Sequence, residues 1–425
     1  MEKFEPGTFH YVNNKLYCEH VPVQNIIEKT GTPAYIYSKK FFTEKYNEFS
    51  SAFSYVKHSI YFAVKSNFNL NVIKIFADLG AGVDVNSGGE LFRARRVGID
   101  PQKIILTGVG KTREEIKLGL ELNVKLIKAE SPEEIELINR IAAEMDTVAP
   151  IAIRINPNVD AKTHPYISTG LAENKFGIDA SEAEKIFEKY SGLEHIRFTG
   201  IDMHIGSQIT SKQPFVEAME KMAEVFKRVR AAGVPLAHFD VGGGIGVQYK
   251  NEEVFTPADL AGAVKHILLG LDCEIMFEPG RFLTANGGIL VTDVLYTKKN
   301  RNKNFIIVDT AMTDLMRPAL YNSYHHVQPI EITTEKDIDA DIVGPVCESS
   351  DFIAKNRQIN ECKAGDKLAV MSAGAYGMVM ASNYNGRRRP PEIIVDGDTF
   401  HVSRSRETYE HLLWDEELVS ELHRK

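Results

Sequence analysis

Between about Ser59 and Gly280, short segments rich in valine and isoleucine alternate with longer amphipathic segments. This alternation is typical of β-strands that alternate with α-helices. The eight candidate strands read SIYFAVK, GVDVNS, KIILTG, LIKAE, IAIRINP, FTGIDMHIG, HFDVGGG and EIMFEPG. Eight such units predict a (β/α)8 TIM barrel, which typically needs about 250 residues. A doubly wound open sheet is the alternative, but we find no GxGxxG motif that opens a first helix.

After Gly280 the sequence changes in character. The strand-like runs there are separated by turn residues and show little helical periodicity: GGILVTDVLY, KNFIIVDT, DIDADIVGP, DKLAVMSAG and EIIVDGDTFHVS. They predict a mostly β second domain. The first 35 residues are turn-rich, and we expect them to join it. The predicted division is a barrel over residues 36–280 and a mostly β domain formed by residues 1–35 and 281–425.

Composition narrows the class of protein. The chain has 425 residues, enough for two domains, and its formal charge of -8 argues against a general nucleic-acid surface. The start of the sequence lacks an apolar leader and no apolar run is long enough to span a bilayer, so we expect a cytoplasmic protein. Four scattered cysteines predict neither a disulfide framework nor a CxxC metal site.

Reactive or very small residues follow the candidate strands. The active site of a TIM barrel lies at the C-terminal ends of its strands. These ends carry Lys65, Asp84 with Asn86, His204, Gly242 to Gly244, and Glu278 to Arg281. Taken singly, each has an ordinary explanation, such as a lysine that extends to solvent or a glutamate that pairs with an arginine. Their convergence at one barrel mouth favours a functional site.

This set of residues fits a phosphorylated aldehyde cofactor. A desolvated lysine such as Lys65 loses its proton more easily and can form a Schiff base. The N–H groups of a glycine turn after the seventh strand can hold a phosphate. A carboxylate, for which Glu278 is the candidate, keeps a pyridine nitrogen protonated, so that the ring accepts electrons. We therefore predict pyridoxal 5'-phosphate, bound covalently at Lys65.

A series of motifs in fixed order identifies a family. The motifs are FAVKSN, HIGSQ, VGGGIG, EPGR, RPALY, GPVCESSD and SAGAYG, and HPYISTG at 164–170 and NKFGI at 174–178 join them. Together they resemble the pyridoxal-phosphate-dependent decarboxylases of the alanine-racemase-like fold, and the diaminopimelate decarboxylases most closely. The resemblance extends from about Gly31 to RETYEHLL near the end of the chain.

The resemblance implies roles for residues around the cofactor. It implies that Lys65 is the Schiff-base lysine, that His204 stacks on the ring, and that Glu278 is the partner of the pyridine nitrogen. The residues that it implies around the phosphate are Ser207, Gly243, Gly280, Arg281 and Tyr376. Asp84, at the end of the second strand, is a further cofactor-binding candidate.

The resemblance also implies a substrate site built by two subunits. Arg281, Arg317 and Tyr321, with Tyr376 nearby, are expected to hold a distal carboxylate, and Glu348 a distal amine. Such a clamp suits a substrate with an amino-acid group at both ends, because guanidinium groups bind carboxylates bidentately. Cys347 is the expected proton donor. Cys347 and Glu348 are expected to come from the second subunit of a homodimer.

The expected reaction is decarboxylation of meso-2,6-diaminopimelate to L-lysine and carbon dioxide, the last step of lysine biosynthesis. Two alternatives stay open. A decarboxylase of ornithine or arginine would generally carry an aspartate where this chain has Glu348. A non-catalytic pyridoxal-phosphate-binding homologue would lack the second domain or have lost catalytic residues, whereas this chain has a predicted second domain and retains Lys65, Cys347 and Glu348.

Overall fold

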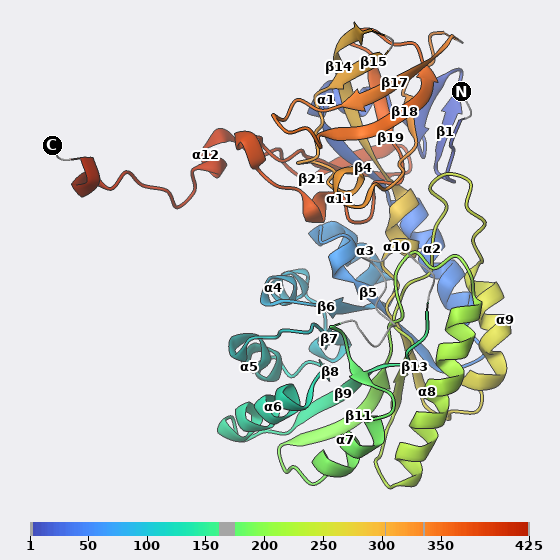
Figure 1. Ribbon diagram of the computed structural model, residues 1–425, viewed down its shortest axis with the longest axis vertical. Helices are drawn as coiled ribbons and strands as arrows, with labels where there is room; N and C mark the ends of the chain where they lie inside the picture. The colour runs from blue at the N-terminus through green and yellow to red at the C-terminus, as the bar shows by residue number, and fades with distance from the viewer. Residues whose placement is uncertain (1–2, 161–174, 302, 335, 424–425) are drawn as a thin grey trace. The chain divides into compact units, whose positions relative to one another are not determined.

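The structure is a computed structural model that describes residues 3–160, 175–301, 303–334 and 336–423 (Figure 1). The chain forms two compact units. One unit consists of Lys39–Gly287 with Gly374–Val379, and the other of Met1–Ser38, Gly288–Ala373 and Met380–Lys425. No helix of the described residues is long and apolar enough to cross a membrane.

The first unit contains a closed barrel of parallel strands, as predicted. In spatial order the barrel strands are β9 (Ala149–Asn156), β11 (Ile196–Asp202), β12 (His238–Asp240), β13 (Glu274–Phe277), β5 (His58–Ala63), β6 (Gly82–Val85), β7 (Ile104–Leu106) and β8 (Leu126–Ala129). Pairing of β8 with β9 closes the barrel. A short strand, β10 (Ile178–Asp179), adds to β9 outside it. All eight candidate strands are therefore barrel strands.

Helices cover the outside of the barrel. They are α2 (Lys39–Ala52), α3 (Leu70–Asp78), α4 (Gly88–Val97), α5 (Arg113–Glu121), α6 (Pro132–Glu144), α7 (Ala183–Tyr190), α8 (Gln213–Ala231) and α9 (Pro257–Leu268). Local sequence fixes several of their ends. Ser87 and Ser131 cap α4 and α6, and Thr112 and Thr256 form capping boxes at α5 and α9. Gly98 ends α4 in the left-handed conformation.

The barrel interior is apolar in one layer and charged in the next. Tyr61, Ile105, Leu126, Ala152 and Met276 form a buried cluster that comes from five different strands. Because side chains alternate along a strand, the residue two positions later points to the same side. The charged side chains therefore lie above the apolar layer, nearer the C-terminal ends of the strands, where a TIM barrel carries its functional residues.

The second unit is mostly β, as predicted. Its large sheet has the order β18 (Phe352–Asn360), β17 (Asp337–Val343), β15 (Lys303–Val308), β14 (Gly288–Asn300), β4 (Ala34–Ser38), β20 (Glu392–Asp396) and β21 (Thr399–Arg404), while β19 (Lys367–Val370) pairs with β14 and with β16 (Val327–Pro329). A smaller sheet has the order β1 (Phe9–Val12), β2 (Lys15–Cys18) and β3 (Val21–Pro22). The short helices are α1 (Val23–Thr30), α11 (Arg317–Tyr321) and α12 (Tyr409–Leu412).

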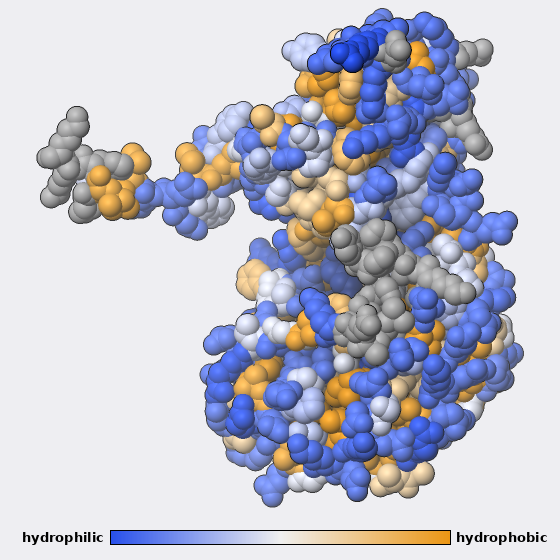
Figure 2. Space-filling view, in the orientation of Figure 1, coloured by the Kyte–Doolittle hydropathy of each residue, from blue (hydrophilic) through white to orange (hydrophobic). Residues whose placement is uncertain are grey.

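A buried apolar cluster joins the two ends of this unit's sequence. Phe9 and Ile26, near the N-terminus, share it with Ile289, Ala369 and Ile393. The strand β4 explains the arrangement, because it lies between β14 and β20 and pairs with both. The N-terminal segment is thus an integral part of this core. Among the described residues, six of the sixteen large apolar side chains that stay exposed lie from α12 onward, and Figure 2 shows orange residues near the C-terminus.

Candidate active site

A cluster of charged side chains lies inside the barrel above its apolar layer. Lys128 on β8 is completely buried, and its Nζ lies 2.8 Å from Asp202 Oδ1 and 2.8 Å from Asp240 Oδ2. The same ammonium group bonds to Glu278 Oε1. Arg154 Nε lies 3.9 Å from Asp202 Oδ2. Three carboxylates from the ends of β11, β12 and β13 thus surround one lysine.

Burial sets the ionisation of these carboxylates. Burial, with help from Asp240 and Asp84, raises the pKa of Glu278 well above its ordinary value, while Lys128 acts in the opposite direction. Burial also raises the pKa of Asp240 to about 6, again against the attraction of Lys128. Because uncompensated charge is costly in a buried site, a positive group beside Glu278 is needed to keep it ionised.

Lys65 lies in a single turn of 3-10 helix, Val64–Ser66, directly after β5. Its Nζ lies 3.8 Å from Asp84 Oδ2, and its side chain is 42% exposed. Burial alone would lower the pKa of Lys65, but attraction to Asp84, Tyr376 and Glu278 outweighs it and raises the pKa above its ordinary value. The expectation that desolvation makes this lysine lose its proton more easily is therefore wrong, because acidic groups surround it.

The ring of His204 is held by the glycine turn. Gly243 N–H donates to His204 Nδ1 at 3.2 Å, so this nitrogen accepts and the ring proton belongs on Nε2. Burial, together with Lys65, Arg154 and Lys128, lowers the pKa of His204 well below its ordinary value. The imidazole is therefore neutral. Since Gly243 N–H is engaged by His204, the phosphate contact expected of Gly243 stays a prediction.

The glycine turn packs too closely to accept any other residue. A Cβ atom on Gly242 would lie 2.4 Å from Met203 O, and one on Gly243 would lie 2.3 Å from Glu278 O. Gly242 also has a φ of 72°, which favours glycine. The turn therefore brings bare backbone against the end of β13, beside Glu278.

Arg281 lies in a group with three other candidate or neighbouring side chains. Its NH2 donates to Ser207 Oγ at 3.1 Å and its NH1 donates to Tyr249 Oη at 2.6 Å. Its guanidinium lies over the Tyr376 ring, 4.7 Å from the centroid. Tyr376 has a left-handed φ of 56°, and its N–H donates to Ser66 O next to Lys65. The barrel unit thus brings Ser207, Arg281 and Tyr376 together.

Four predicted residues lie in the mostly β unit. Arg317 and Tyr321 belong to α11, and Arg317 NH1 lies 3.0 Å from His325 Nε2. Cys347 and Glu348 lie in an exposed turn after β17, where Cys347 N–H donates to Asn385 Oδ1 at 2.9 Å. Glu348 Oε1 accepts from Ser350 N–H at 3.1 Å. The HPYISTG motif lies outside the described residues.

Several polar residues near the site were not found from the sequence. Lys128 lies inside the apolar segment LIKAE, and Asp202 and Asp240 lie inside GIDMH and HFDVG. A charged residue within such an apolar segment indicates a buried partner of opposite charge. The sequence therefore carries a signal for these three residues. Tyr249 and His325 carry no comparable signal, because only the fold shows what they contact.

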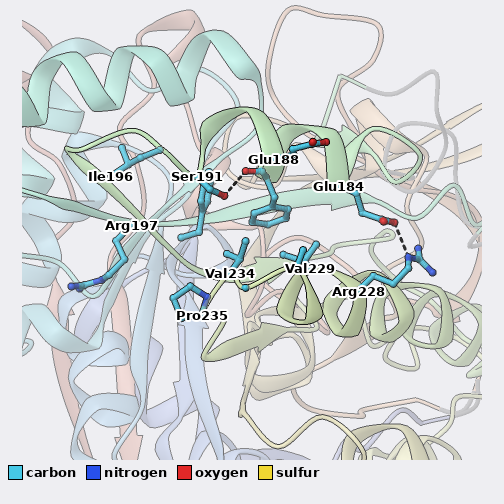
Figure 3. A pocket seen from close by; sticks show the side chains of 13 residues that line it. Glu184, Glu188, Ser191, Ile196, Arg197, Arg228, Val229, Val234 and Pro235 are labelled. Atoms are coloured by element: carbon cyan, nitrogen blue, oxygen red, sulfur yellow. Dashed lines mark hydrogen bonds and ion pairs between the residues drawn. The ribbon is translucent and has the colours of Figure 1, made fainter.

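A pocket of about 670 Å³ lies elsewhere on the barrel unit (Figure 3). It is lined by α7, the start of β11, the end of α8 and the loop that follows, and Glu184 pairs there with Arg228 at 2.7 Å. The beginning of a barrel strand lies at the end opposite the active site. None of the predicted site residues lines this pocket.

Comparison with known proteins decides the family. The family described as "Pyridoxal-dependent decarboxylase, pyridoxal binding domain" matches residues 40–285. The chain is 45% identical to the diaminopimelate decarboxylase of Pseudomonas aeruginosa over 97% of this chain and 99% of that protein. It is 47% identical to that of Haemophilus influenzae, over 95% and 98%. The chain belongs to the diaminopimelate decarboxylase family.

Solved diaminopimelate decarboxylases have the same fold. The enzyme from Helicobacter pylori, complexed with L-lysine, is 41% identical, with a TM-score of 0.89 over 94% of this chain and 100% of that one. The enzyme from M. jannaschii, also in complex with L-lysine, is 34% identical, with a TM-score of 0.94 over 99% and 100%. The likeness therefore covers both units of this chain.

The barrel mouth fits pyridoxal 5'-phosphate, the cofactor of pyridoxal-dependent decarboxylases. Lys65 offers a half-exposed amine beside Asp84. Asp84 is completely buried, and its Oδ1 has no hydrogen-bond partner among the described residues. Glu278 offers a buried carboxylate, and the bare backbone of the glycine turn lies against it. A lysine amine and an acidic partner for the pyridine nitrogen are groups that this cofactor uses.

Proposed function

We infer that the chain decarboxylates meso-2,6-diaminopimelate to L-lysine and carbon dioxide, with pyridoxal 5'-phosphate as its cofactor. The observation that carries this inference is identity of 45% and 47% with diaminopimelate decarboxylases over almost the whole chain. The reaction is the last step of lysine biosynthesis, and L-lysine, its product, is bound in two solved relatives. The chain is thus a pyridoxal-phosphate-dependent carbon–carbon lyase.

Four residues serve the cofactor and its ring in this proposal. Lys65 is the covalent anchor, and Asp84 lies beside it. When bound, the cofactor supplies a pyridine ring that takes up the electrons of the bond to the leaving carboxylate. Glu278 accepts a hydrogen bond from the pyridine nitrogen and holds its proton in place. His204 lies against the ring face, and its neutral state adds no competing positive charge.

The phosphate group is assigned to the backbone and hydroxyl groups beside the ring. Gly280 and the backbone of Arg281 supply N–H groups, and Ser207 and Tyr376 supply hydroxyls. Gly243 would exchange its bond to His204 Nδ1 for one to the phosphate. Support comes from the contacts of Arg281, whose side chain holds Ser207 by a hydrogen bond and stacks on Tyr376. Phosphate sites made from loops after the seventh and eighth strands are common in TIM barrels.

The distal end of the substrate is assigned to a charged clamp. Arg281, Arg317 and Tyr321, with Tyr376, bind the distal carboxylate, and Glu348 binds the distal amine. The clamp distinguishes diaminopimelate from ornithine, since ornithine has no distal carboxylate and two arginines would repel its ammonium group. The basic side chains therefore determine specificity rather than the chemistry of decarboxylation.

Cys347 is the proposed acid that returns a proton to the carbon that lost carbon dioxide. We propose that Cys347 and Glu348 reach the site of a second copy of the chain in a homodimer. In this proposal the mostly β domain, residues 1–35 and 281–425, builds the dimer, and the barrel domain, residues 36–280, binds the cofactor.

We propose that the protein acts in the cytoplasm. All four cysteines are free, which fits the reducing environment of that compartment.

The shared site is tested by mixing two inactive variants. Lys65→Ala removes the cofactor anchor and Cys347→Ala removes the acid, so each protein alone should be inactive. Mixed subunits should regain part of the activity, because a hybrid dimer has one site with both residues intact. Inactive mixtures with verified subunit exchange would contradict a shared site.

Substrate selectivity tests the reaction itself. Purified protein with added pyridoxal 5'-phosphate is incubated with meso-diaminopimelate, ornithine or arginine, and kcat/KM is measured for each. We expect a clear preference for diaminopimelate. Preference for ornithine or arginine would keep the cofactor chemistry but contradict the clamp, and no turnover of any of them would favour a non-catalytic homologue.

A further inference from the structure

We propose that Lys128 is a positioning residue for the reaction: its buried ammonium favours the ionised form of the Glu278 carboxylate and directs it toward the pyridine nitrogen of the cofactor. The proposal deepens the proposed function and rests on it. Lys128 itself does not contact substrate in this account. It acts through Glu278, the residue assigned to the cofactor ring.

The geometry gives Lys128 a specific place. It stands two residues after Leu126 on β8, so its side chain points into the barrel interior above the apolar layer. Its ammonium bonds to Glu278 Oε1 and lies 2.8 Å from an oxygen of each of Asp202 and Asp240. An ammonium group has three N–H donors. Two of these donors bond to Asp202 and Glu278, and Asp240 on a third strand adds an ion pair to the same ammonium.

Lys128 supplies the nearest positive charge to the three carboxylates around it. Asp202, Asp240 and Glu278 offer oxygens within 4.8 Å of one another, close enough to hold a metal ion. The ammonium of Lys128 occupies the position between them. Arg154 contributes less to this group, because its NH1 is paired with Glu130 at 3.2 Å and only its Nε approaches Asp202. Lys128 is thus the built-in cation for the three carboxylates.

The state of Glu278 matters for the chemistry. An ionised carboxylate accepts the N–H of a protonated pyridine, whereas a neutral carboxyl donates its own proton and leaves the ring without positive charge. The ring is then a weaker acceptor of electrons. Burial and the neighbouring Asp240 and Asp84 raise the pKa of Glu278, and Lys128 opposes them. Removing Lys128 should therefore raise the pKa of Glu278 further and favour its protonated form.

Lys128→Met tests the proposal, because methionine fills similar space without charge. We expect kcat and cofactor affinity each to fall roughly 10- to 100-fold, as when a partner that supports a functional ligand is removed. KM should change little. The acidic limb of the kcat–pH profile should move to higher pH, because Glu278 then loses its proton only at higher pH.

Asp202→Asn should move the same limb in the opposite direction. Asp202 raises the pKa of Glu278, and the amide oxygen of asparagine can still accept from Lys128. The double variant Lys128→Met/Asp202→Asn loses one charge of each sign, so its profile should lie nearer the wild-type profile than that of Lys128→Met. If Lys128→Met fails to fold, the double variant is compared with Asp202→Asn: a limb at higher pH in the double variant supports the proposal, and identical limbs would overturn it.

Lys111→Met is the matched control for loss of a buried lysine. The Lys111 side chain is 1% exposed and pairs with Glu134 at 2.8 Å, and its Nζ also donates to Gly108 O and Lys128 O. It contacts none of the three carboxylates by an ion pair. Lys111→Met should lower thermal stability and leave the acidic limb of the profile in place.

The decisive measurement combines cofactor titration of the apoprotein with kcat–pH profiles for wild type and these variants. Opposite shifts for Lys128→Met and Asp202→Asn support the proposal. An unmoved limb, or shifts in the same direction, would overturn it while wild type still binds cofactor and releases lysine. Failure of wild type to do either would instead count against the proposed function.

Discussion

Arg317 is held by a histidine that the sequence analysis did not assign. His325 is completely buried, its Nδ1 lies 2.9 Å from Met371 O, and its Nε2 lies 3.0 Å from Arg317 NH1. A carbonyl only accepts and a guanidinium only donates, so the ring proton belongs on Nδ1 and Nε2 accepts from Arg317. His325 thus orients a guanidinium that we assign to the distal carboxylate of the substrate.

This contact predicts a specific loss on substitution. His325→Phe removes the acceptor of Arg317, and we expect KM for diaminopimelate to rise roughly 10-fold with a smaller change in kcat, since hydrogen bonds to charged groups are worth about 1.5–3 kcal/mol. His325→Gln retains an acceptor and a donor and should lose less. Steady-state kinetics check the prediction, and equal KM values in all three proteins would contradict it.

At the scale of elements, apolar periodicity predicted the barrel because each strand is buried on both faces. The eight strands were found from runs such as SIYFAVK and EIMFEPG, and the structure confirms them. The strand β18 was not predicted, because FIAKNRQIN alternates buried and exposed residues only in part. Its pairing with β17 depends on tertiary context that no local pattern records.

The residues of the site likewise fall into two groups, those that the sequence indicates and those whose contacts only the fold shows. Lys65, His204 and Glu278 could be proposed from the sequence because strand ends carry function in a barrel. The sequence could not show that Lys128 belongs with these residues. Its side chain on β8 meets the side chains that follow β11, β12 and β13 only when the barrel closes. The direction of the pKa shift of Lys65 was missed for the same reason, because acidic groups distant in sequence outweigh burial.

The glycine turn after β12 gives a prediction for an element. Gly243→Ala would place a Cβ 2.3 Å from Glu278 O, so the backbone beside Glu278 must move, and we expect loss of both stability and cofactor affinity. Gly262→Ala is the matched control. Gly262 lies inside α9 with no atom within 4 Å of the added Cβ, and alanine there should stabilise the protein by about 0.5–1 kcal/mol.

Thermal unfolding and cofactor titration distinguish the two glycine variants. Normal cofactor affinity in Gly243→Ala would show that the close approach of this turn to Glu278 is not required. A loss of affinity in Gly262→Ala as well would show that the effect is not specific to the turn.

At the scale of the whole molecule, ion pairs make stability depend on pH. Burial alone would raise the pKa of Glu407, but hydrogen bonds from Arg389 and Asn383 outweigh it and lower the pKa to about 2. A carboxylate with a depressed folded-state pKa stabilises the protein above its unfolded-state pKa, which is about 4.3. Its contribution is lost as pH falls from there through about 2.

Glu407→Gln should therefore destabilise the protein by roughly 1–3 kcal/mol at neutral pH, and the difference from wild type should shrink as the solution becomes acidic. Chemical denaturation at a series of pH values measures the free energy of unfolding of both proteins. A difference that stays constant with pH would contradict the assigned ionisation of Glu407.

The two units carry different parts of the proposed chemistry. The barrel unit holds Lys65, His204 and Glu278, which we assign to the cofactor, while the mostly β unit holds Arg317 and Cys347, which we assign to substrate and proton transfer. The central claim is that this chain converts diaminopimelate to lysine by loss of one carboxylate.

The most direct test quantifies carbon dioxide and lysine together in one reaction of the wild-type protein with meso-diaminopimelate and pyridoxal 5'-phosphate. We expect equal amounts of the two products, and neither product from Lys65→Ala. Substrate consumption without lysine, or lysine released without an equal amount of carbon dioxide, would contradict it.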